Sequence, residues 1–408
     1  MPEQAPWKFQ KILKPLVDLP QAHTVLVGRV LTSRGDEVIE HGFVELADGK
    51  IAAVGHAADL GDRSANAVKT IGTILPGLFN NHAHLGWDGI HDLANQSMND
   101  APEITAYKCA GNMLVSLRAG VTTVRDLGMN TSNLFAKQAV EQGIFPGPRL
   151  LVCGQAIIQT GGHTYWCCRE ASGPDEMRRA VREQVRAGAD LIKIMGSHDR
   201  IEMTDEELAA VIDETHRNGL KITAHATWDE VINRVVRFGV DSVEHGGSMR
   251  DATIQLLLDR KVPVVTTFAP LVMQANAEVA RRYNLPEWII ARRQHSLKDT
   301  ALYDGIVNAA KAGVTIAFGT DAGSPVVGHD VIVPEMECMI KLGVVQDAYA
   351  AIRSATSVSA QINNLNDKLG TLEAGKLADV IVVDGNPLAD LSALRHVKMT
   401  FVGGKQLV

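Results

Sequence analysis

From about residue 76 to residue 357 the chain alternates short apolar runs with longer amphipathic stretches, and this alternation restricts the possible folds more than any other feature. The amphipathic stretches have helical periodicity and include 174–187, 205–218 and 229–238. The apolar runs are typical of buried parallel strands and cover 121–127, 149–153, 191–195, 222–225, 242–245, 262–267 and 315–319. With the run that leads into His84 they make eight strands, the number in a closed (β/α)8 barrel.

A doubly wound open sheet also alternates strands with helices, and it is the alternative. In that fold the ligand-binding residues gather at one switch point, whereas here polar residues follow most of the strands. The alternation therefore predicts an α/β protein whose main domain is a (β/α)8 TIM barrel.

Both ends of the chain have the pattern of an antiparallel sheet instead. Strand-like runs occupy 24–27, 38–40, 42–46 and 51–54, and they return at 380–384 and 399–404. Asp48-Gly49 lies between two of these runs and is a strong hairpin signal. We expect the two ends to pair in one small β-sandwich domain, formed by residues 1–75 and 358–408, beside a barrel formed by residues 76–357.

The composition disfavours several classes of partner. Hydrophobic residues make up 46% and charged residues 21% of the 408 residues, as in globular proteins with a large core. The net charge is -7 without a basic block, which argues against nucleic acid as a partner. No apolar run is long enough for a bilayer and the N-terminal stretch is a poor signal peptide, so no membrane partner is expected. The five cysteines are an odd number and indicate reduced thiols in a cytoplasmic protein.

Side chains at the ends of the predicted strands indicate a metal centre. His82 and His84 are two residues apart, so on a strand both imidazoles point to one side. The full set lies where the catalytic groups of a barrel converge: His82, His84, Lys193, His225, His245 and Asp321. Imidazole and carboxylate groups bind zinc-like cations, and six groups exceed what one tetrahedral ion takes. The pattern therefore predicts two divalent ions, which together can activate water and polarise a carbonyl.

Lys193 is the unusual member of this set because an ammonium cannot ligate a cation. It lies between Ile192 and Ile194, so it should be inside the barrel, where an unpaired charge is costly. It could be neutral, paired in a salt bridge, or converted to an anion. From the residues alone, a salt bridge is favoured.

These motifs, in this order, resemble the metal motifs of the amidohydrolase superfamily. The resemblance covers nearly the whole chain and rests on Pro76-Gly77…His82-x-His84, Lys193, Ala224-His225-Ala226, Glu244-His245-Gly246 and Gly319-Thr320-Asp321. Flanking motifs, including Thr160-Gly161-Gly162-His163, are similar to the imidazolonepropionase and Xaa-Pro dipeptidase (prolidase) branch. The resemblance implies a barrel with a composite β-domain and a binuclear centre, usually of zinc, bridged by a carboxylated Lys193.

The resemblance also implies a role for each residue. It assigns ligands to a more buried and a more exposed ion: His82, His84 and Asp321 for the first, and His225 and His245 for the second. A hydroxide would bridge the ions beside Lys193 and attack the substrate, while Asp321 takes its proton and passes it to the leaving nitrogen. His163 would donate a hydrogen bond to the scissile carbonyl oxygen, with a structural role in its loop as an equal alternative.

The chain departs from the prolidase pattern where those enzymes hold the substrate's carboxylate. In place of a tyrosine and an arginine it has Thr227 and Asn233. The loop containing His198 replaces a Gly-rich one, and the insertion 270–295 could cap the site and make it more apolar. We therefore expect hydrolysis of an amide-type C–N bond in a small molecule, such as an N-acyl amino acid, a carbamate or an aryl amide.

Three alternatives stay open. The chain could be an Xaa-Pro-type dipeptidase. It could be a mononuclear cyclic amide or imidazolone hydrolase, or a deaminase, which shares most ligands but typically lacks the bridging lysine. A non-catalytic scaffold would normally have lost ligands, and none is missing here. Enzymes of this kind are commonly homo-oligomers, and we expect the same of this chain.

Overall fold

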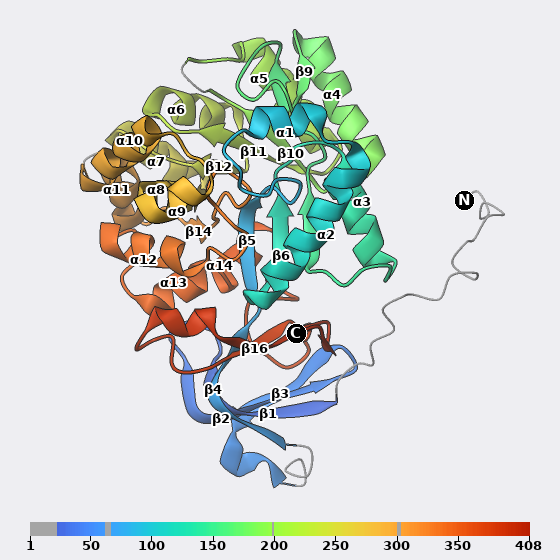
Figure 1. Cartoon of the computed structure of the whole chain (residues 1–408), viewed down its shortest axis with the longest axis vertical. Helices are drawn as coiled ribbons and strands as arrows, with labels where there is room; N and C mark the ends of the chain where they lie inside the picture. Colours follow the sequence, from blue (N-terminus) through green and yellow to red (C-terminus); the bar gives the residue numbers. More distant parts are fainter. Residues whose placement is uncertain (1–22, 62–66, 198–199, 300–302) are drawn as a thin grey trace, which may run out of the picture.

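The computed structural model describes residues 23–61, 67–197, 200–299 and 303–408. A ring of strands surrounded by helices forms the larger part, and a sheet built from both ends of the chain lies below it in Figure 1. The structure is therefore an α/β barrel with a terminal β-sheet domain, as the sequence predicts.

The barrel consists of eight strands in chain order: β5 (Leu78–Ala83), β6 (Val121–Asp126), β7 (Arg149–Val152), β10 (Leu191–Met195), β11 (Lys221–Ala226), β12 (Ser242–His245), β13 (Val264–Thr266) and β14 (Ile316–Phe318). Parallel pairing joins β5 to β7 and β10 to β14 in sequence. Two hydrogen bonds complete the ring, Asp190 N to Val152 O and Asp321 N to His82 O, each 2.8 Å long. The ring is closed, so the doubly wound alternative is wrong.

Helices surround the ring, and their ends follow local sequence signals. The described helices are α1 (Leu93–Asn99), α2 (Pro102–Arg118), α3 (Ser132–Glu141), α4 (Pro174–Ala187), α5 (Asp205–Arg217), α6 (Asp229–Phe238), α7 (Asp251–Arg260), α8 (Ala269–Ala275), α9 (Ala277–Arg282), α10 (Glu287–Lys298), α11 (Asp304–Ala312), α12 (Val333–Leu342), α13 (Ala348–Ser354) and α14 (Ser357–Ile362). Thr204 forms a capping box at the start of α5. Gly188 and Gly313 end α4 and α11 in the left-handed conformation that glycine favours. None of the described helices has the length and apolar composition to cross a bilayer.

The terminal sheet interleaves strands from the two ends of the chain. Its order is β17-β16-β15-β4-β1-β2-β3, with β1 (Thr24–Leu31), β2 (Val38–Ala47), β3 (Lys50–His56), β4 (Ala67–Pro76), β15 (Val380–Val383), β16 (Val397–Val402) and β17 (Lys405–Gln406). Asp48 and Gly49 both have positive φ, as a tight hairpin between β2 and β3 requires. The two ends therefore form one sheet, and the domain limits at 75/76 and 357/358 stay a prediction.

Two irregular parts of the barrel bear on the site. After β7, the short strands β8 (Ile157–Gln159) and β9 (Arg169–Ala171) flank the loop that contains His163. After β13, the insertion 270–295 forms α9 and most of α8 and α10. These helices bury a small core of their own, with Ala280, Leu285 and Ile290 packed against Val326.

Candidate metal centre

Three of the predicted ligands meet at the point where the barrel closes. His82 is the last residue but one of β5, and His84 comes directly after this strand. Asp321 lies in the loop just after β14. Asp321 Oδ1 is 3.2 Å from His84 Nε2 and 3.5 Å from His82 Nε2. Ligand atoms that share one zinc-like ion at about 2.0–2.2 Å are at most about 4.4 Å apart, so these distances fit a common cation.

The backbone at Asp321 is held in an uncommon conformation. Its φ is +57°, in the left-handed region that residues with a β-carbon seldom adopt. His245, another predicted ligand, has a φ of +69°. Such conformations cluster at functional sites because surrounding contacts must hold them in place.

In three of these histidines a hydrogen bond engages one ring nitrogen, which leaves the other ring nitrogen for a metal. Three Nδ1 atoms are engaged: His82 with Glu244 Oε2 at 2.7 Å, His84 with the Gly128 carbonyl at 2.5 Å, and His245 with Thr267 Oγ1 at 2.7 Å. A carboxylate or carbonyl only accepts, so Nδ1 carries the proton in His82 and His84, and Nε2 keeps its lone pair. This is the usual arrangement of metal-binding histidines.

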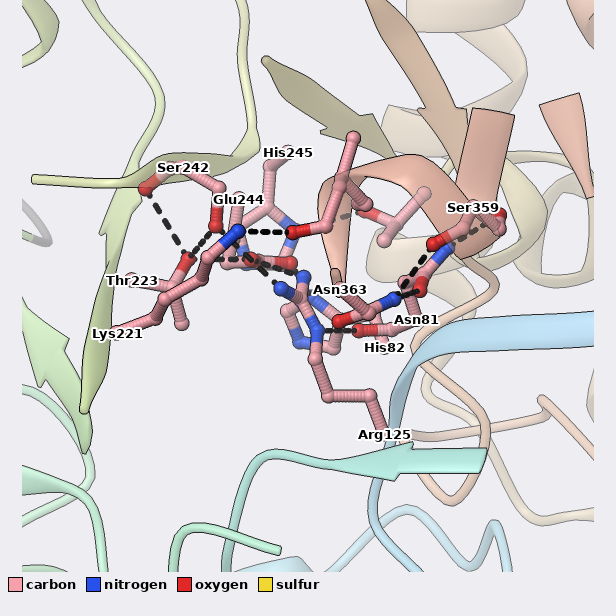
Figure 2. A network of polar contacts seen from close by, with 12 residues as sticks. Asn81, His82, Arg125, Lys221, Thr223, Ser242, Glu244, His245, Ser359 and Asn363 are labelled. Carbon is pink, nitrogen blue, oxygen red and sulfur yellow. Dashed lines mark hydrogen bonds and ion pairs between the residues drawn. The ribbon is translucent and has the colours of Figure 1, made fainter. Parts of the chain in front are cut away.

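Glu244 belongs to a buried polar network beneath the histidines (Figure 2). Its Oε1 accepts a 2.5 Å hydrogen bond from Arg125 Nη2 and another from the Thr223 hydroxyl. Arg125 Nε donates in turn to the Asn81 carbonyl at 2.7 Å, beside His82. Glu244 is fully buried and Arg125 is 5% exposed. The guanidinium therefore compensates a carboxylate that would otherwise be costly to bury.

The electrostatics favour the protonation states that bind metal. Burial lowers the pKa of His82 and His245 well below that of a free imidazole, and the charge of Lys193 acts in the same direction. Burial would raise the pKa of Asp321, but the contact of its carboxylate with the His84 ring and the positive charge of Lys193 outweigh burial, so this pKa is lowered. Neutral imidazoles and an ionised carboxylate are the forms that ligate cations.

The remaining predicted residues lie beside this group. The His245 ring centroid is 4.6 Å from that of His82 and 4.4 Å from that of His225, and His163 follows at 5.1 Å from His225. Lys193 is 2% exposed, and burial lowers its pKa. Within the described part of the chain its ammonium forms no ion pair, so the favoured salt bridge is not found there.

A comparison with protein families now bears on this geometry. A model described as "Amidohydrolase family" matches residues 73–407 of the chain. The chain belongs to the amidohydrolase family. It is accordingly a metal-dependent hydrolase that acts on carbon–nitrogen bonds, with His82, His84 and Asp321 in its metal site.

Relatives of this amidohydrolase are similar over nearly its whole length. An ochratoxinase from Aspergillus niger is 27% identical to it, over 94% of this chain and 86% of the relative. The crystal structure of a Xaa-Pro dipeptidase with methionine bound in the active site has a TM-score of 0.82 and 28% identity. A crystal structure of an amidohydrolase has a TM-score of 0.80 and 30% identity. Both structural alignments cover 94% of this chain and 99% of the other.

The metal site of this amidohydrolase opens into a cavity of about 400 Å³. All six predicted ligands line it, as does His163. Much of the remaining wall is apolar and comes from Trp87, Leu93, Met129, Trp166 and Met195. The predicted chemical groups and an apolar wall therefore share one cavity.

The aromatic part of this wall was not predicted from the sequence. The Trp87 ring centroid is 4.5 Å from that of His84 and 5.7 Å from that of Trp166. Trp87 is fixed by its Nε1–H, which donates to Ser97 Oγ at 2.9 Å. Each tryptophan is three residues after a predicted site histidine, and that short spacing was the available signal.

Other expectations have mixed outcomes. His198 lies outside the described residues. None of the described residues lining the cavity comes from the insertion 270–295, so the expectation that this segment caps the site is not supported. At the position of the prolidase arginine, Asn233 donates to Thr253 Oγ1 at 3.2 Å, and the adjacent Arg234 pairs with Asp205 at 2.7 Å.

Proposed function

We propose that this amidohydrolase hydrolyses an amide-type C–N bond of a small, largely apolar molecule with two divalent ions, zinc being the expected metal. The observation that carries this proposal is the convergence of six candidate ligands on one cavity at the mouth of the barrel. Candidate substrates are N-acyl amino acids, carbamates and aryl amides.

The residues fit a binuclear metal site. His82, His84 and Asp321 would hold one ion, and His225 and His245 the other, with Lys193 between them. The lowered pKa of Lys193 favours its neutral amine, the form that adds to carbon dioxide. In that reaction a bond forms between Nζ and the carbon, one proton leaves, and the product is an anionic carbamate. When bound, the ions supply an activated water and polarise the substrate carbonyl.

The protein's own groups then move the protons and stabilise the developing charge. Asp321 accepts a proton from the attacking water and delivers it to the leaving nitrogen as the C–N bond breaks. His163, on the cavity wall, donates a hydrogen bond to the carbonyl oxygen as it gains negative charge.

The cavity wall supports a substrate without a free α-carboxylate beside the scissile bond. The cationic side chains among its described lining residues are Lys193 and any protonated histidines, with no arginine. Asn233 and Arg234 are engaged with other residues. Trp87 and Trp166 instead offer flat apolar surface, which suits an aromatic or alkyl group.

A Xaa-Pro dipeptidase is the second candidate. It is favoured by the similar structures of a Xaa-Pro dipeptidase and of a prolidase complexed with N-methylphosphonate-L-proline, each 28% identical to this chain. The two candidates differ in whether the substrate's carboxylate needs a cationic partner.

A substrate panel on metal-loaded enzyme distinguishes them. The panel contains N-acyl amino acids, carbamates, aryl amides and Xaa-Pro dipeptides, each also as an ester or amide that lacks the free carboxylate. We expect turnover of neutral amides or carbamates, with little loss on blocking a carboxylate. Turnover confined to Xaa-Pro dipeptides with a free carboxylate would contradict the proposal.

A further inference from the structure

Two neighbouring thiols face the cavity of the metal centre. Cys167 and Cys168 lie in the loop between β8 and β9, and both line the cavity. Cys167 is 9% exposed, and Cys168 is partly exposed. All five cysteines are free, and the other three are buried and are not among the described residues that line the cavity: Cys109, Cys153 and Cys338.

The loop holds the two sulfur atoms side by side. Their Sγ atoms are 4.0 Å apart. The Cys167 thiol donates to the Thr164 carbonyl at 3.4 Å, and the Cys168 sulfur is 3.3 Å from Thr164 Oγ1. Thr164 itself has a φ of +59°, in the left-handed region. One turn residue therefore orients both thiols.

This geometry suits a shared ligand better than a disulfide. Consecutive Cα atoms across a trans peptide are about 3.8 Å apart, below the about 4.4–6.8 Å usual for disulfides, so a bond between these sulfurs would be strained. Two sulfurs that are each about 2.3 Å from one shared atom can be up to about 4.6 Å apart, so a single atom can bridge sulfurs that are 4.0 Å apart.

The surroundings can also accommodate an organic group on the bound atom. Cys167 packs with Trp87 and Met129, and Cys168 with Ala156 and Met195. These side chains form the apolar wall described above, so a ring attached to an atom between the sulfurs has apolar surface to cover.

We propose that Cys167 and Cys168 form a dithiol site for trivalent organoarsenicals, and that occupation of this site obstructs the hydrolytic cavity. The reaction with an arsenoso compound needs no oxidant or reductant. Each sulfur forms a bond to arsenic, the As=O bond breaks, and the two thiol protons leave with the oxygen as water.

Phenylarsine oxide provides the test on the full metal-loaded chain. We expect intact-mass spectrometry to find one phenylarsenic group per chain, removed by a dithiol such as 2,3-dimercaptopropanol but not by an equal thiol concentration of 2-mercaptoethanol. Cys167→Ala and Cys168→Ala should each lose this label, because one thiol cannot chelate. Cys338→Ala, which removes a buried thiol elsewhere, should keep it.

Label that persists in both Cys167→Ala and Cys168→Ala, or that is lost in Cys338→Ala, would place the site elsewhere and overturn the proposal. Circular dichroism of each variant checks that it is folded. The obstruction depends on the proposed function and is read separately, as turnover after treatment relative to turnover before it. We expect at least a tenfold loss for the unmodified chain and less than twofold for Cys168→Ala. A labelled chain with full turnover would overturn the obstruction and leave the binding site standing.

Discussion

Glu244 determines which nitrogen of His82 can reach a metal ion. Because its carboxylate accepts from Nδ1, Nε2 is the ring nitrogen left for coordination. Replacing such a supporting carboxylate typically weakens metal binding about 10- to 100-fold. We expect Glu244→Gln to bind zinc more weakly by that factor, measured by competition with a chromogenic chelator.

Glu183→Gln is the matched control, since Glu183 pairs with Arg169 at the surface. It should leave zinc affinity unchanged. If Glu244→Gln bound zinc as tightly as the unmodified chain, Glu244 would have no supporting role at the metal site.

Glu335 makes stability depend on pH. It is fully buried, its Oε2 accepts from Ala269 N at 2.5 Å, and burial raises its pKa to about 8. Between the unfolded value of 4.5 and about 8 the folded chain holds a proton that the unfolded chain has lost, so this residue makes stability fall as pH rises. Glu335→Gln is neutral throughout. We expect the Tm of Glu335→Gln minus the Tm of the unmodified chain to be larger at about pH 8 than at about pH 5. If this difference in Tm did not change with pH, the assignment to Glu335 would be wrong.

At the scale of helices, substitution of glycine by alanine is expected to change stability in opposite directions at two positions. Gly111 lies within α2 with open space where a β-carbon would point, so Gly111→Ala should stabilise the protein by about 0.5–1 kcal/mol. Gly239 ends α6 with a φ of +108° and no close neighbour, so Gly239→Ala should cost about 1–2 kcal/mol through backbone strain alone. Thermal unfolding of both variants measures the two effects, and shifts of the same sign would contradict the argument.

Local signals account for most of the elements. The helices 174–187 and 229–238 are found with their predicted limits, and 205–218 ends one residue earlier, at Arg217. Caps explain this success, because Gly188 and Gly239 carry the left-handed conformation that ends a helix. The strands differ more from their predicted limits. The strand predicted over 262–267, for example, covers only Val264–Thr266. Where a strand ends depends on its neighbours in the ring, and local sequence does not contain that information.

The site shows the same division between local and spatial information. His82 and His84 were identifiable because strand periodicity alone places them on one side. Trp87 and Trp166 were not, because their contact joins two loops that only the closed barrel brings together. The expectation that the insertion 270–295 caps the site is not supported for a related reason. Its apolar residues Leu285 and Ile290 pack in a small core with Ala280 and Val326, and the described lining of the cavity includes no residue of the insertion.

At the scale of the whole molecule, both ends of the chain complete one sheet. β15 lies between β4 and β16, and all four of its residues are buried. A chain truncated after residue 379 would expose the edge of β4 and the apolar core beneath it. We expect this variant to be insoluble or to lose cooperative unfolding.

Truncation after residue 404 is the control, since it removes only the edge strand β17 and the residues that follow it. That shorter deletion should remain soluble, with a Tm lowered by a few degrees. A soluble, cooperatively folded chain ending at residue 379 would show that the barrel does not need the C-terminal strands.

We propose that six converging side chains hold two metal ions, and elemental analysis of the zinc-loaded, desalted chain counts those ions. We predict about two ions per chain, falling to one or fewer in Lys193→Ala and partly restored by a short carboxylic acid. As a control, Lys398→Ala, which removes a lysine with a 60% exposed side chain in the terminal sheet, should keep both ions. One ion per chain, unchanged by Lys193→Ala, would rule out the binuclear centre and favour a mononuclear hydrolase.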